Sequence, residues 1–478
     1  MQFEWLRNYP NFQGHSAAID SLGNIYSVGD SSRYLIVLKH NPNGNLIWKR
    51  KLNYVKSNSP ILVATDKNND LYVSCGNIAH NYVLTKIDSF GQLKWENILI
   101  YGGYDEPYSI AVDKAGYIYL TGRTFNGITK CLTVKYTPQG DTLWARINPE
   151  YVMGGNYVSL DDSGYVYVAG NYITSEGGYY YGTLKYDNNG NLKWFSKYRY
   201  HQNTISYGLC VKPDNKGNCY VSGYIRLYSG NFISGLIKYD YKGDSVWVRI
   251  FGDSLTYTSG STNINFDDIG NIYLSSIYTL KYDTTGYLNW HIYNDSYSTS
   301  FAYHNNRLYF AGTSLWQGPD SLRIFERDEK GKLISQNYYP KSPSKLDLKF
   351  YNNSFYLIIN SQDSLILMKF RTSPNSIVNN TTIVSDYKLH QNIPNPFNPS
   401  SVIRFQLPVV SNVVLKVYDA MGREVQTLVN ENLNSGTYSV EFNGEGLSSG
   451  VYFYKIDVRS SGSSTGKFTD VKRMVLLK

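Results

Sequence analysis

Residues 101–122 read YGGYDEPYSIAVDKAGYIYLTG, and this stretch decides the fold of the longer part of the chain. Apolar and polar residues alternate on both sides of a turn that contains Asp and Gly. Alternation with period two around such a turn predicts a hairpin of two β-strands, Tyr108–Asp113 and Tyr117–Gly122. Thr129–Thr137 and Asp141–Ile147 continue the pattern, so we expect four short strands in this unit.

The same pattern recurs along the chain, mostly at intervals of about 47 to 53 residues. A turn followed by an apolar strand with Tyr begins at eight places: Gly23, Asp70, Gly116, Gly164, Gly217, Gly270, Arg307 and Ser354. A second phrase, Gly-x-x-x-Trp, follows in the first six units: Gly44/Trp48, Gly91/Trp95, Gly140/Trp144, Gly190/Trp194, Gly243/Trp247 and Gly286/Trp290. A four-stranded unit that repeats in this way is typical of a β-propeller blade.

The two ends of this repeat region complement each other. The last unit has three strands, near Lys345–Tyr351, Ser354–Asn360 and Ser364–Phe370, and Phe3–Arg7 matches the Trp strand that it lacks. We therefore expect the N-terminal strand to lie alongside Ser364–Phe370 and to close the ring, which covers strand edges that promote aggregation. The sequence predicts an all-β fold with an eight-bladed propeller, or a seven-bladed one if the short sixth unit is degenerate.

Three recurring residue types favour a structural role. We expect the Trp rings to pack between adjacent blades. We expect the aspartates at the ends of the innermost strands to cap turns: Asp20, Asp66, Asp113, Asp161 and Asp267. The net charge is +8, but Lys and Arg recur once or twice in each repeat, so we expect them to be solvated and to form no nucleic-acid stripe.

Composition restricts the other function classes. No apolar run is long enough to cross a membrane as a helix, and Met1–Trp5 lacks a signal-peptide pattern, so we expect a mature or shortened form of any exported protein. The four Cys have no metal-ligand spacing, and we expect no metal, cofactor or catalytic residue. Cys210 and Cys219 flank a turn, where they form either a cross-strand disulfide or two buried thiols.

The repeats resemble the SBBP-type β-propeller repeat of bacterial surface and secreted proteins over most of residues 1–370. The resemblance implies a fold rather than an activity, because propellers host many functions. The Gly-x-x-x-Trp turn is also similar to the repeats of quinoprotein dehydrogenases, which implies an alternative: an exported enzyme, quinoprotein-like or a hydrolase, with a site in the channel. Adjacent cysteines common in those dehydrogenases do not occur here.

Aromatic residues gather where we expect the longer loops. If tight turns join strands one to two and three to four, longer loops lie together on the opposite face. Eight aromatic residues fall there: Tyr101, Tyr104, Tyr151, Tyr172, Tyr179, Tyr224, Tyr228 and Trp316. Rings among Ser, Gly and Asn suit a glycan or peptide ligand, although surface decoration in a Tyr-rich chain is the alternative.

The C-terminal part of the chain predicts a second domain. Residues 373–386 are polar and read as a linker between a propeller at 1–372 and a domain at 387–478. Six short strands follow the proline-rich Asn392–Pro399, which favours a small immunoglobulin-like β-sandwich.

This domain resembles the type A sorting domain of the type IX secretion system in Bacteroidota, on the motifs Asn395–Pro399, Val417–Gly422, Leu447–Tyr454 and Met474–Lys478. The resemblance implies export of folded cargo, with the secretion machinery and a sorting protease as partners. It also implies that the signal residues are Gly450, Val451, Tyr452, Tyr454, Val475, Leu476 and Lys478. We therefore expect a monomeric, non-catalytic protein, secreted or on the outer-membrane surface, with a binding or scaffold role. An ordinary adhesion sandwich is the alternative for this domain.

Overall fold

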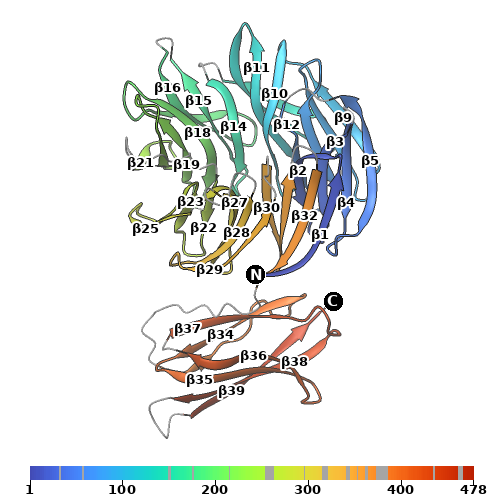
Figure 1. Cartoon of the computed structure of the whole chain (residues 1–478), viewed down its shortest axis with the longest axis vertical. Coiled ribbons are helices and arrows are strands. Elements are labelled where there is room, and N and C mark those ends of the chain that lie inside the picture. Colours follow the sequence, from blue (N-terminus) through green and yellow to red (C-terminus); the bar gives the residue numbers. More distant parts are fainter. Residues whose placement is uncertain are drawn as a thin grey trace. The chain divides into compact units, whose positions relative to one another are not determined.

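The structure is a computed structural model that describes every residue except 32–33, 56–58, 149–151, 175–176, 215, 253–262, 295, 315–320, 341–344, 353, 361–363, 373–385, 434–435, 461–466 and 478. The described residues form strands and no helix, so none of them forms a helix able to span a membrane. The chain divides into two compact units, Met1–Thr372 and Ser373–Lys478 (Figure 1).

The first unit consists of antiparallel sheets whose strands follow one another in sequence. The first four-stranded sheet consists of β2 (Gln13–Ile19), β3 (Ile25–Ser31), β4 (Tyr34–His40) and β5 (Leu46–Val55). The second consists of β6 (Leu62–Thr65), β7 (Leu71–Gly76), β8 (Tyr82–Ile87) and β9 (Leu93–Leu99). The third consists of β10 (Tyr104–Val112), β11 (Ile118–Asn126), β12 (Ile128–Tyr136) and β13 (Thr142–Ile147).

The next eight strands form one sheet: β14 (Val152–Leu160), β15 (Val166–Ile173), β16 (Tyr179–Tyr186), β17 (Leu192–Tyr198), β18 (Ile205–Pro213), β19 (Cys219–Arg226), β20 (Phe232–Tyr239) and β21 (Ser245–Phe251). A single parallel pair, Tyr179 with Ile205, joins two four-stranded halves. Two further sheets are β22 (Ile264–Phe266), β23 (Ile272–Ser275), β24 (Tyr278–Tyr282) and β25 (Leu288–Tyr293), and β26 (Ser296–His304), β27 (Arg307–Ser314), β28 (Ser321–Asp328) and β29 (Leu333–Pro340).

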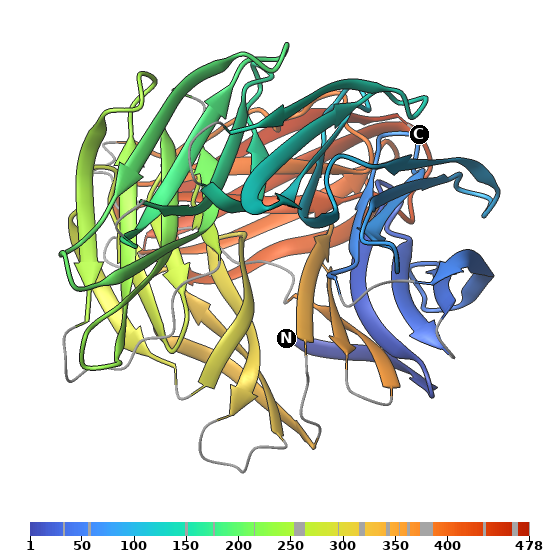
Figure 2. The same ribbon diagram turned by 90° about the horizontal axis from the view of Figure 1, so that it is seen from above.

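The remaining sheet combines the two ends of the unit. It holds β30 (Lys345–Tyr351), β31 (Ser354–Asn360), β32 (Ser364–Arg371) and the N-terminal β1 (Gln2–Pro10), in the order β1-β32-β31-β30. The antiparallel register runs from Gln2 opposite Arg371 to Pro10 opposite Ser364, which is the pairing that the sequence indicated. Figure 2 shows this dark blue strand beside the orange ones. The first strand of each four-stranded set contacts the first strand of the next, and β30 contacts β2.

The recurring Trp packs on the recurring Gly, and this contact explains the Gly-x-x-x-Trp phrase. The ring of Trp144 in β13 donates a hydrogen bond to the Asn188 carbonyl oxygen in the next sheet (3.1 Å). A Cβ atom on Gly190 would lie 2.7 Å from this ring, and the φ angle of Gly190 is 78°, a left-handed conformation that favours glycine. The prediction that these rings pack between adjacent units is confirmed, and Trp5 packs in the same way on Gly44.

The expected difference in loop length is wrong. Except between β27 and β28, the connections between second and third strands are no longer than the aspartate turns; Gly127 alone joins β11 to β12. A glycine with a φ angle of 78° allows the chain to reverse there within a single residue. The antiparallel order still places these connections at the strand ends opposite the aspartate turns.

The cysteines are buried free thiols, so the disulfide alternative is wrong. In the hairpin of β18 and β19, Cys210 lies opposite Ser222 and Cys219 lies opposite Pro213. Burial raises the pKa of Cys210 to about 12, which keeps this thiol protonated.

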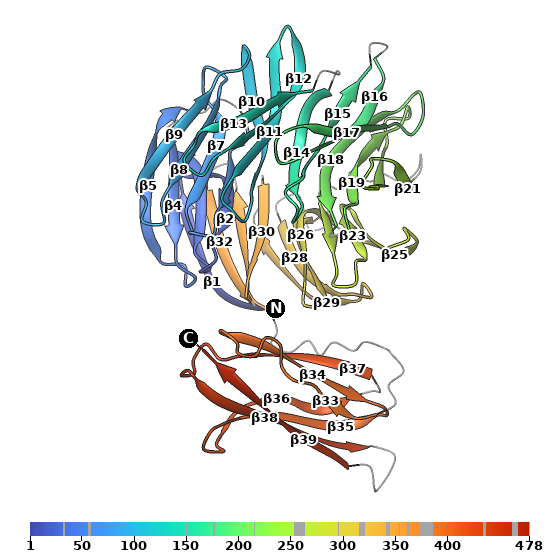
Figure 3. The same cartoon turned by 180° about the vertical axis from the view of Figure 1, so that it is seen from behind.

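The second unit has two sheets around one core. The sheets are β33 (Lys388–Leu389), β34 (Ser400–Leu407) and β37 (Gly436–Asn443), and β36 (Glu424–Leu433), β35 (Ser411–Asp419), β38 (Gly450–Ser460) and β39 (Lys467–Leu476). Figure 3 shows β35, β38 and β39 side by side. Alternate residues of the strands, such as Phe405, Leu415 and Ile456, are buried in the shared core.

Candidate functional site

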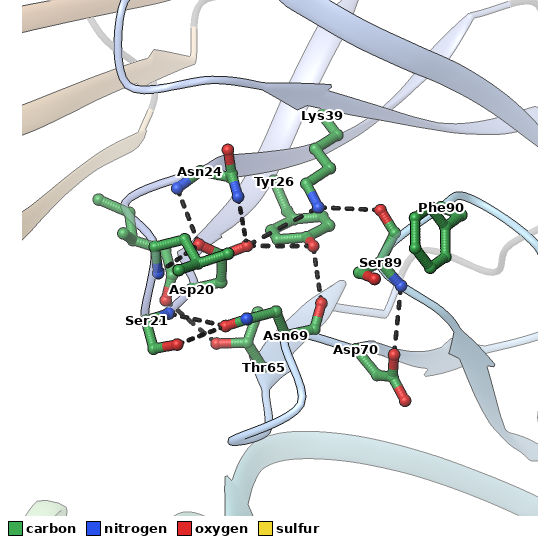
Figure 4. Close-up of polar contacts among 12 residues, drawn as sticks. Asp20, Ser21, Asn24, Tyr26, Lys39, Thr65, Asn69, Asp70, Ser89 and Phe90 are labelled. Carbon is green, nitrogen blue, oxygen red and sulfur yellow. Dashed lines mark hydrogen bonds and ion pairs between the residues drawn. The ribbon is translucent and has the colours of Figure 1, made fainter. Parts of the chain in front are cut away.

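The repeated aspartates hold turns together. Asp20 Oδ1 accepts hydrogen bonds from the backbone N–H groups of Leu22 (3.0 Å) and Asn24 (2.8 Å). Its Oδ2 atom accepts one from the Asn24 side chain (2.8 Å) and lies 3.3 Å from the Tyr26 hydroxyl (Figure 4). Asp66, Asp113, Asp161 and Asp267 accept the corresponding backbone bonds. The prediction that these carboxylates cap turns is confirmed.

The same turns bind one sheet to the next. Asn69 Oδ1 accepts hydrogen bonds from the backbone N–H (2.9 Å) and the hydroxyl (2.7 Å) of Ser21. The Tyr26 hydroxyl donates to the Asn69 carbonyl oxygen (2.7 Å), and Lys39 Nζ donates to the Ser89 carbonyl oxygen (2.9 Å) (Figure 4). These contacts fill the interface between the sheet of β2–β5 and that of β6–β9.

Several repeated lysines are not solvated, so that expectation was wrong for this position. The Lys before Tyr, Ile or His in the third strand is buried in five units: Lys39, Lys86, Lys135, Lys185 and Lys281. The Lys39 ammonium lies 4.8 Å from the centre of the Tyr26 ring, so a cation–π contact replaces part of its hydration. The period of the repeat reveals the position of these lysines, but not that a tyrosine ring covers each of them.

The expected ligand residues occupy different environments. Tyr101 and Tyr228 are exposed, Tyr228 by 94%, while Tyr104, Tyr179 and Tyr224 are half-buried. Tyr172 is only 7% exposed, because its ring packs on Tyr180 and Phe195 in the core, so its assignment to a ligand surface is wrong. Tyr151 and Trp316 lie outside the described residues.

One group of rings brings two of these residues together. Tyr207, which the sequence analysis missed, lies 5.9 Å from Tyr179 and 4.8 Å from Tyr224 between ring centres. Phe232 continues the row at 5.2 Å from Tyr224. We call Tyr179, Tyr207, Tyr224 and Phe232 the aromatic row. Tyr207 lies in β18 between the buried residues Ser206 and Gly208, so the alternation of the strand could have placed its ring on the opposite face.

A second group surrounds Tyr104. The ring of His80 stacks on Tyr104 with 3.8 Å between centres, and the Arg123 guanidinium lies 5.4 Å from the Tyr104 ring centre. Arg123 also pairs with the buried Glu106 at 2.8 Å. The ion pair and the stacked rings hold one another in place, which makes this a rigid surface feature.

The expected signal residues of the second unit come together on two paired strands. Gly450 lies opposite Leu476, and Val451 lies opposite Val475, in the register of β38 and β39. Tyr454 is buried: its hydroxyl donates to the His390 carbonyl oxygen (2.8 Å) and accepts from the Asn392 N–H (2.8 Å). Tyr452 is also buried, and Lys478 lies outside the described residues.

The proline-rich segment covers the free edge of β39 near its end. Asn395 Oδ1 accepts a hydrogen bond from the Val475 N–H (3.0 Å). The backbone of Phe397 donates to the Val475 carbonyl oxygen (2.9 Å) and accepts from the Leu477 N–H (3.0 Å). The Asn-Pro-Phe motif and the terminal strand, separate in sequence, therefore form one structure.

The C-terminal unit matches a known family along most of its length. The family described as the secretion system C-terminal sorting domain matches residues 392–470. The C-terminal unit is a sorting domain. This domain implies export to the cell surface or secretion, and interaction with the secretion machinery as cargo.

The first unit matches the family described as the beta-propeller repeat at residues 97–127, which include the hairpin of β10 and β11. The solved structure of Sqt1 from Saccharomyces cerevisiae is similar, with a TM-score of 0.57 and 8% identity over 78% of this chain and 99% of that chain. The structure of BamB from Moraxella catarrhalis gives a TM-score of 0.47 and 13% identity, over 77% of this chain and 98% of that chain. No curated protein matches the sequence. The chain thus contains a β-propeller repeat and ends in a unit that matches the sorting-domain family.

Proposed function

We propose that this protein is a monomeric, non-catalytic propeller that is exported by its sorting domain and binds a glycan or peptide at the cell surface or outside the cell. The sorting domain supports the export, and the aromatic row supports the binding. Half-buried tyrosine rings in a fixed row present apolar faces and hydroxyl groups, which suit a sugar ring or an extended peptide.

We propose further that the propeller is a closed ring of eight blades and that the sorting domain has an immunoglobulin-like topology. The pairing of β1 with β32, the contact of β30 with β2 and the packing of Trp5 on Gly44 support closure. The two sheets around one core support the topology of the sorting domain.

Binding is tested on glycan and peptide arrays with the purified full chain. We expect spots that bind the wild-type chain and lose most of their signal with the double variant Tyr207→Ala and Tyr224→Ala. Tyr287→Ala, at the opposite strand ends and outside the pocket described below, removes an exposed tyrosine ring and is the matched control. Arrays that stay blank, or arrays on which no signal weakens in the double variant, contradict the binding role of the aromatic row.

Export is tested in a host that has the secretion system. The chain that ends at residue 372 should remain inside the cell envelope, while the full chain should reach the medium or the cell surface. Immunoblots of both fractions measure the difference. Equal export of the two chains contradicts the role of the sorting domain in this protein.

A further inference from the structure

A pocket of about 430 Å³ lies between two neighbouring blades, at the strand ends that carry the aspartate turns. Its walls come from β14–β17 and from β18–β21, and they include the rings of Tyr165 and Tyr241 and the side chains of Lys185 and Lys193. This volume falls within the range of sites that hold small molecules. The pocket lies at the opposite strand ends from the aromatic row, so it is a separate place on the propeller.

Lys185 is the unusual residue of this pocket. It is 4% exposed, and its ammonium lies 4.3 Å from the centre of the Tyr165 ring and 4.8 Å from that of Tyr167. Within the part of the chain that the structure describes, it donates no hydrogen bond and forms no ion pair. Burial lowers its pKa. The charge of Asp161 compensates only part of the burial of this ammonium, which has no hydrogen-bond acceptor among the described residues, so an anionic group in the pocket would stabilise it further.

Lys135 is the matched position one blade earlier. Its ammonium lies 4.5 Å from the centre of the Tyr117 ring, but it donates hydrogen bonds to the backbone oxygen (3.2 Å) and to the side-chain oxygen of Asn188. Tyr241 holds the place of Asn188 in the next blade. Its carbonyl oxygen accepts a hydrogen bond from the Trp194 ring (3.1 Å), and its own ring is 62% exposed. The change from Asn to Tyr therefore leaves Lys185 without the acceptor that Lys135 has.

The acidic groups of the pocket already have donors. Asp161 accepts bonds from two backbone N–H groups and from the Tyr167 hydroxyl (3.0 Å). Asp214 accepts bonds from two backbone N–H groups and from the Asn218 side chain (2.8 Å). Asp162, the third carboxylate of the wall, pairs with Lys114 at 2.7 Å. The carboxylates keep their charge, but within the described residues Lys185 and Lys193 hold the ammonium groups of the wall that donate no hydrogen bond, with the Tyr165 and Tyr241 rings beside them.

We propose that this pocket binds an acidic sugar, a hexuronate whose carboxylate pairs with Lys185 and whose ring lies against Tyr165 and Tyr241. A sugar ring has an apolar C–H face that covers a tyrosine ring, and its hydroxyls can bond to the Ser163 hydroxyl at the pocket wall. This inference rests on the proposed binding role and adds to it a second site with a ligand of stated chemistry.

The test is isothermal titration calorimetry on the full chain with D-glucuronate and D-galacturonate, with D-glucose and acetate as reference ligands. We expect a uronate to bind at least about tenfold more tightly than either reference, because only a uronate combines the carboxylate with the sugar ring. Lys185→Gln should weaken uronate binding about tenfold or more. Lys135→Gln removes the matched lysine one blade away and should leave the affinity unchanged.

A second variant adds a group instead of removing one. Tyr241→Asn gives Lys185 the amide that Asn188 gives to Lys135, so it should abolish uronate binding while thermal unfolding stays as in the wild type. Equal affinity for glucose and glucuronate, equal affinity for acetate and glucuronate, no uronate binding, or wild-type affinity in both Lys185→Gln and Tyr241→Asn overturns the proposal. Array signals that depend on Tyr207 and Tyr224 would then still stand, since those rings lie at the other strand ends.

Discussion

Gly190 meets two separate requirements at one residue. Its φ angle of 78° disfavours any side chain, and the space where a Cβ atom would stand is taken by the Trp144 ring at 2.7 Å. The first requirement acts on the backbone alone, whereas the second depends on the neighbouring blade. A pair of substitutions can separate them, because other glycines of this chain have a positive φ angle and open surroundings.

Gly190→Ala should lower the free energy of unfolding by about 2–4 kcal/mol, from the strained backbone and the displaced ring together. Gly230→Ala, with a φ angle of 89° and nothing within 4 Å of its added Cβ, should cost only about 1–2 kcal/mol. Urea unfolding followed by Trp fluorescence measures both values. Equal losses would mean that the Trp contact contributes nothing.

His40 is a buried histidine at the end of β4. Its Nε2 atom forms a hydrogen bond with the Tyr9 hydroxyl (2.5 Å). This bond links β1 to β4 of the next blade. Burial, with a smaller effect of Arg7, lowers the pKa of His40 to about 4 from its ordinary 6.5. Between these two values the unfolded chain binds more protons than the folded chain, so acid favours unfolding.

We expect the free energy of unfolding to fall as pH drops from 6.5 to about 4. His40→Ile should make this fall less steep, because the variant takes up at most one proton fewer when it unfolds. Ile87 occupies the equivalent strand end in the next blade, so isoleucine suits the site. Urea unfolding at several pH values compares the two chains. The same slope in both would show that His40 is protonated equally in the folded and unfolded chains.

At the scale of residues, the sequence allowed the turn aspartates and the packing tryptophans to be predicted, because both recur with the repeat. It did not reveal the buried lysines, since burial of a cation depends on a ring and a carbonyl group from other strands. Tyr172 was misplaced for a related reason: its exposure is set by Phe195 on a different strand.

At the scale of elements, β1 is the strand whose role differs most from its position in sequence. It forms the outer strand of a blade whose other three strands come from residues 345–371. The ring of Trp5 donates to the Pro42 carbonyl oxygen (3.3 Å) and packs on Gly44. The same two contacts to the next blade are made by Trp48, Trp95, Trp144 and Trp194. The sequence predicted this pairing because the last unit lacks one strand.

Trp5→Ala should lower the free energy of unfolding by about 2–3 kcal/mol through lost packing between blades. Leu6→Ala changes the same strand at a residue that is largely exposed, and it should cost less than about 1 kcal/mol. Chemical unfolding of both variants gives the comparison. If the two variants unfold alike, the Trp5 ring does not join the blades.

At the scale of the whole molecule, the propeller and the sorting domain each have their own core. All buried residues of the sorting-domain core lie between Leu389 and Leu476, and the propeller cores draw only on residues before 373. The two-domain organisation was predictable from the change in composition after residue 370. The contact of Asn395 and Phe397 with β39 was not, because it joins segments about 80 residues apart.

We expect two separate unfolding transitions in scanning calorimetry of the full chain, since none of the described core residues is shared between the domains. The chain that ends at residue 372 should keep the propeller transition at an unchanged temperature. A single transition in the full chain, or a large shift in the shortened one, would mean that the two domains stabilise each other.

The pairing of β1 with β32 also sets an order of events during protein synthesis. The partner of β1 leaves the ribosome more than 350 residues after β1 itself, so the first strand waits unpaired while the intervening blades form. Contacts between residues so distant in sequence form slowly, which makes this the late step of folding. A nascent chain that stalls before residue 364 therefore leaves its opening segment without a partner and available to chaperones.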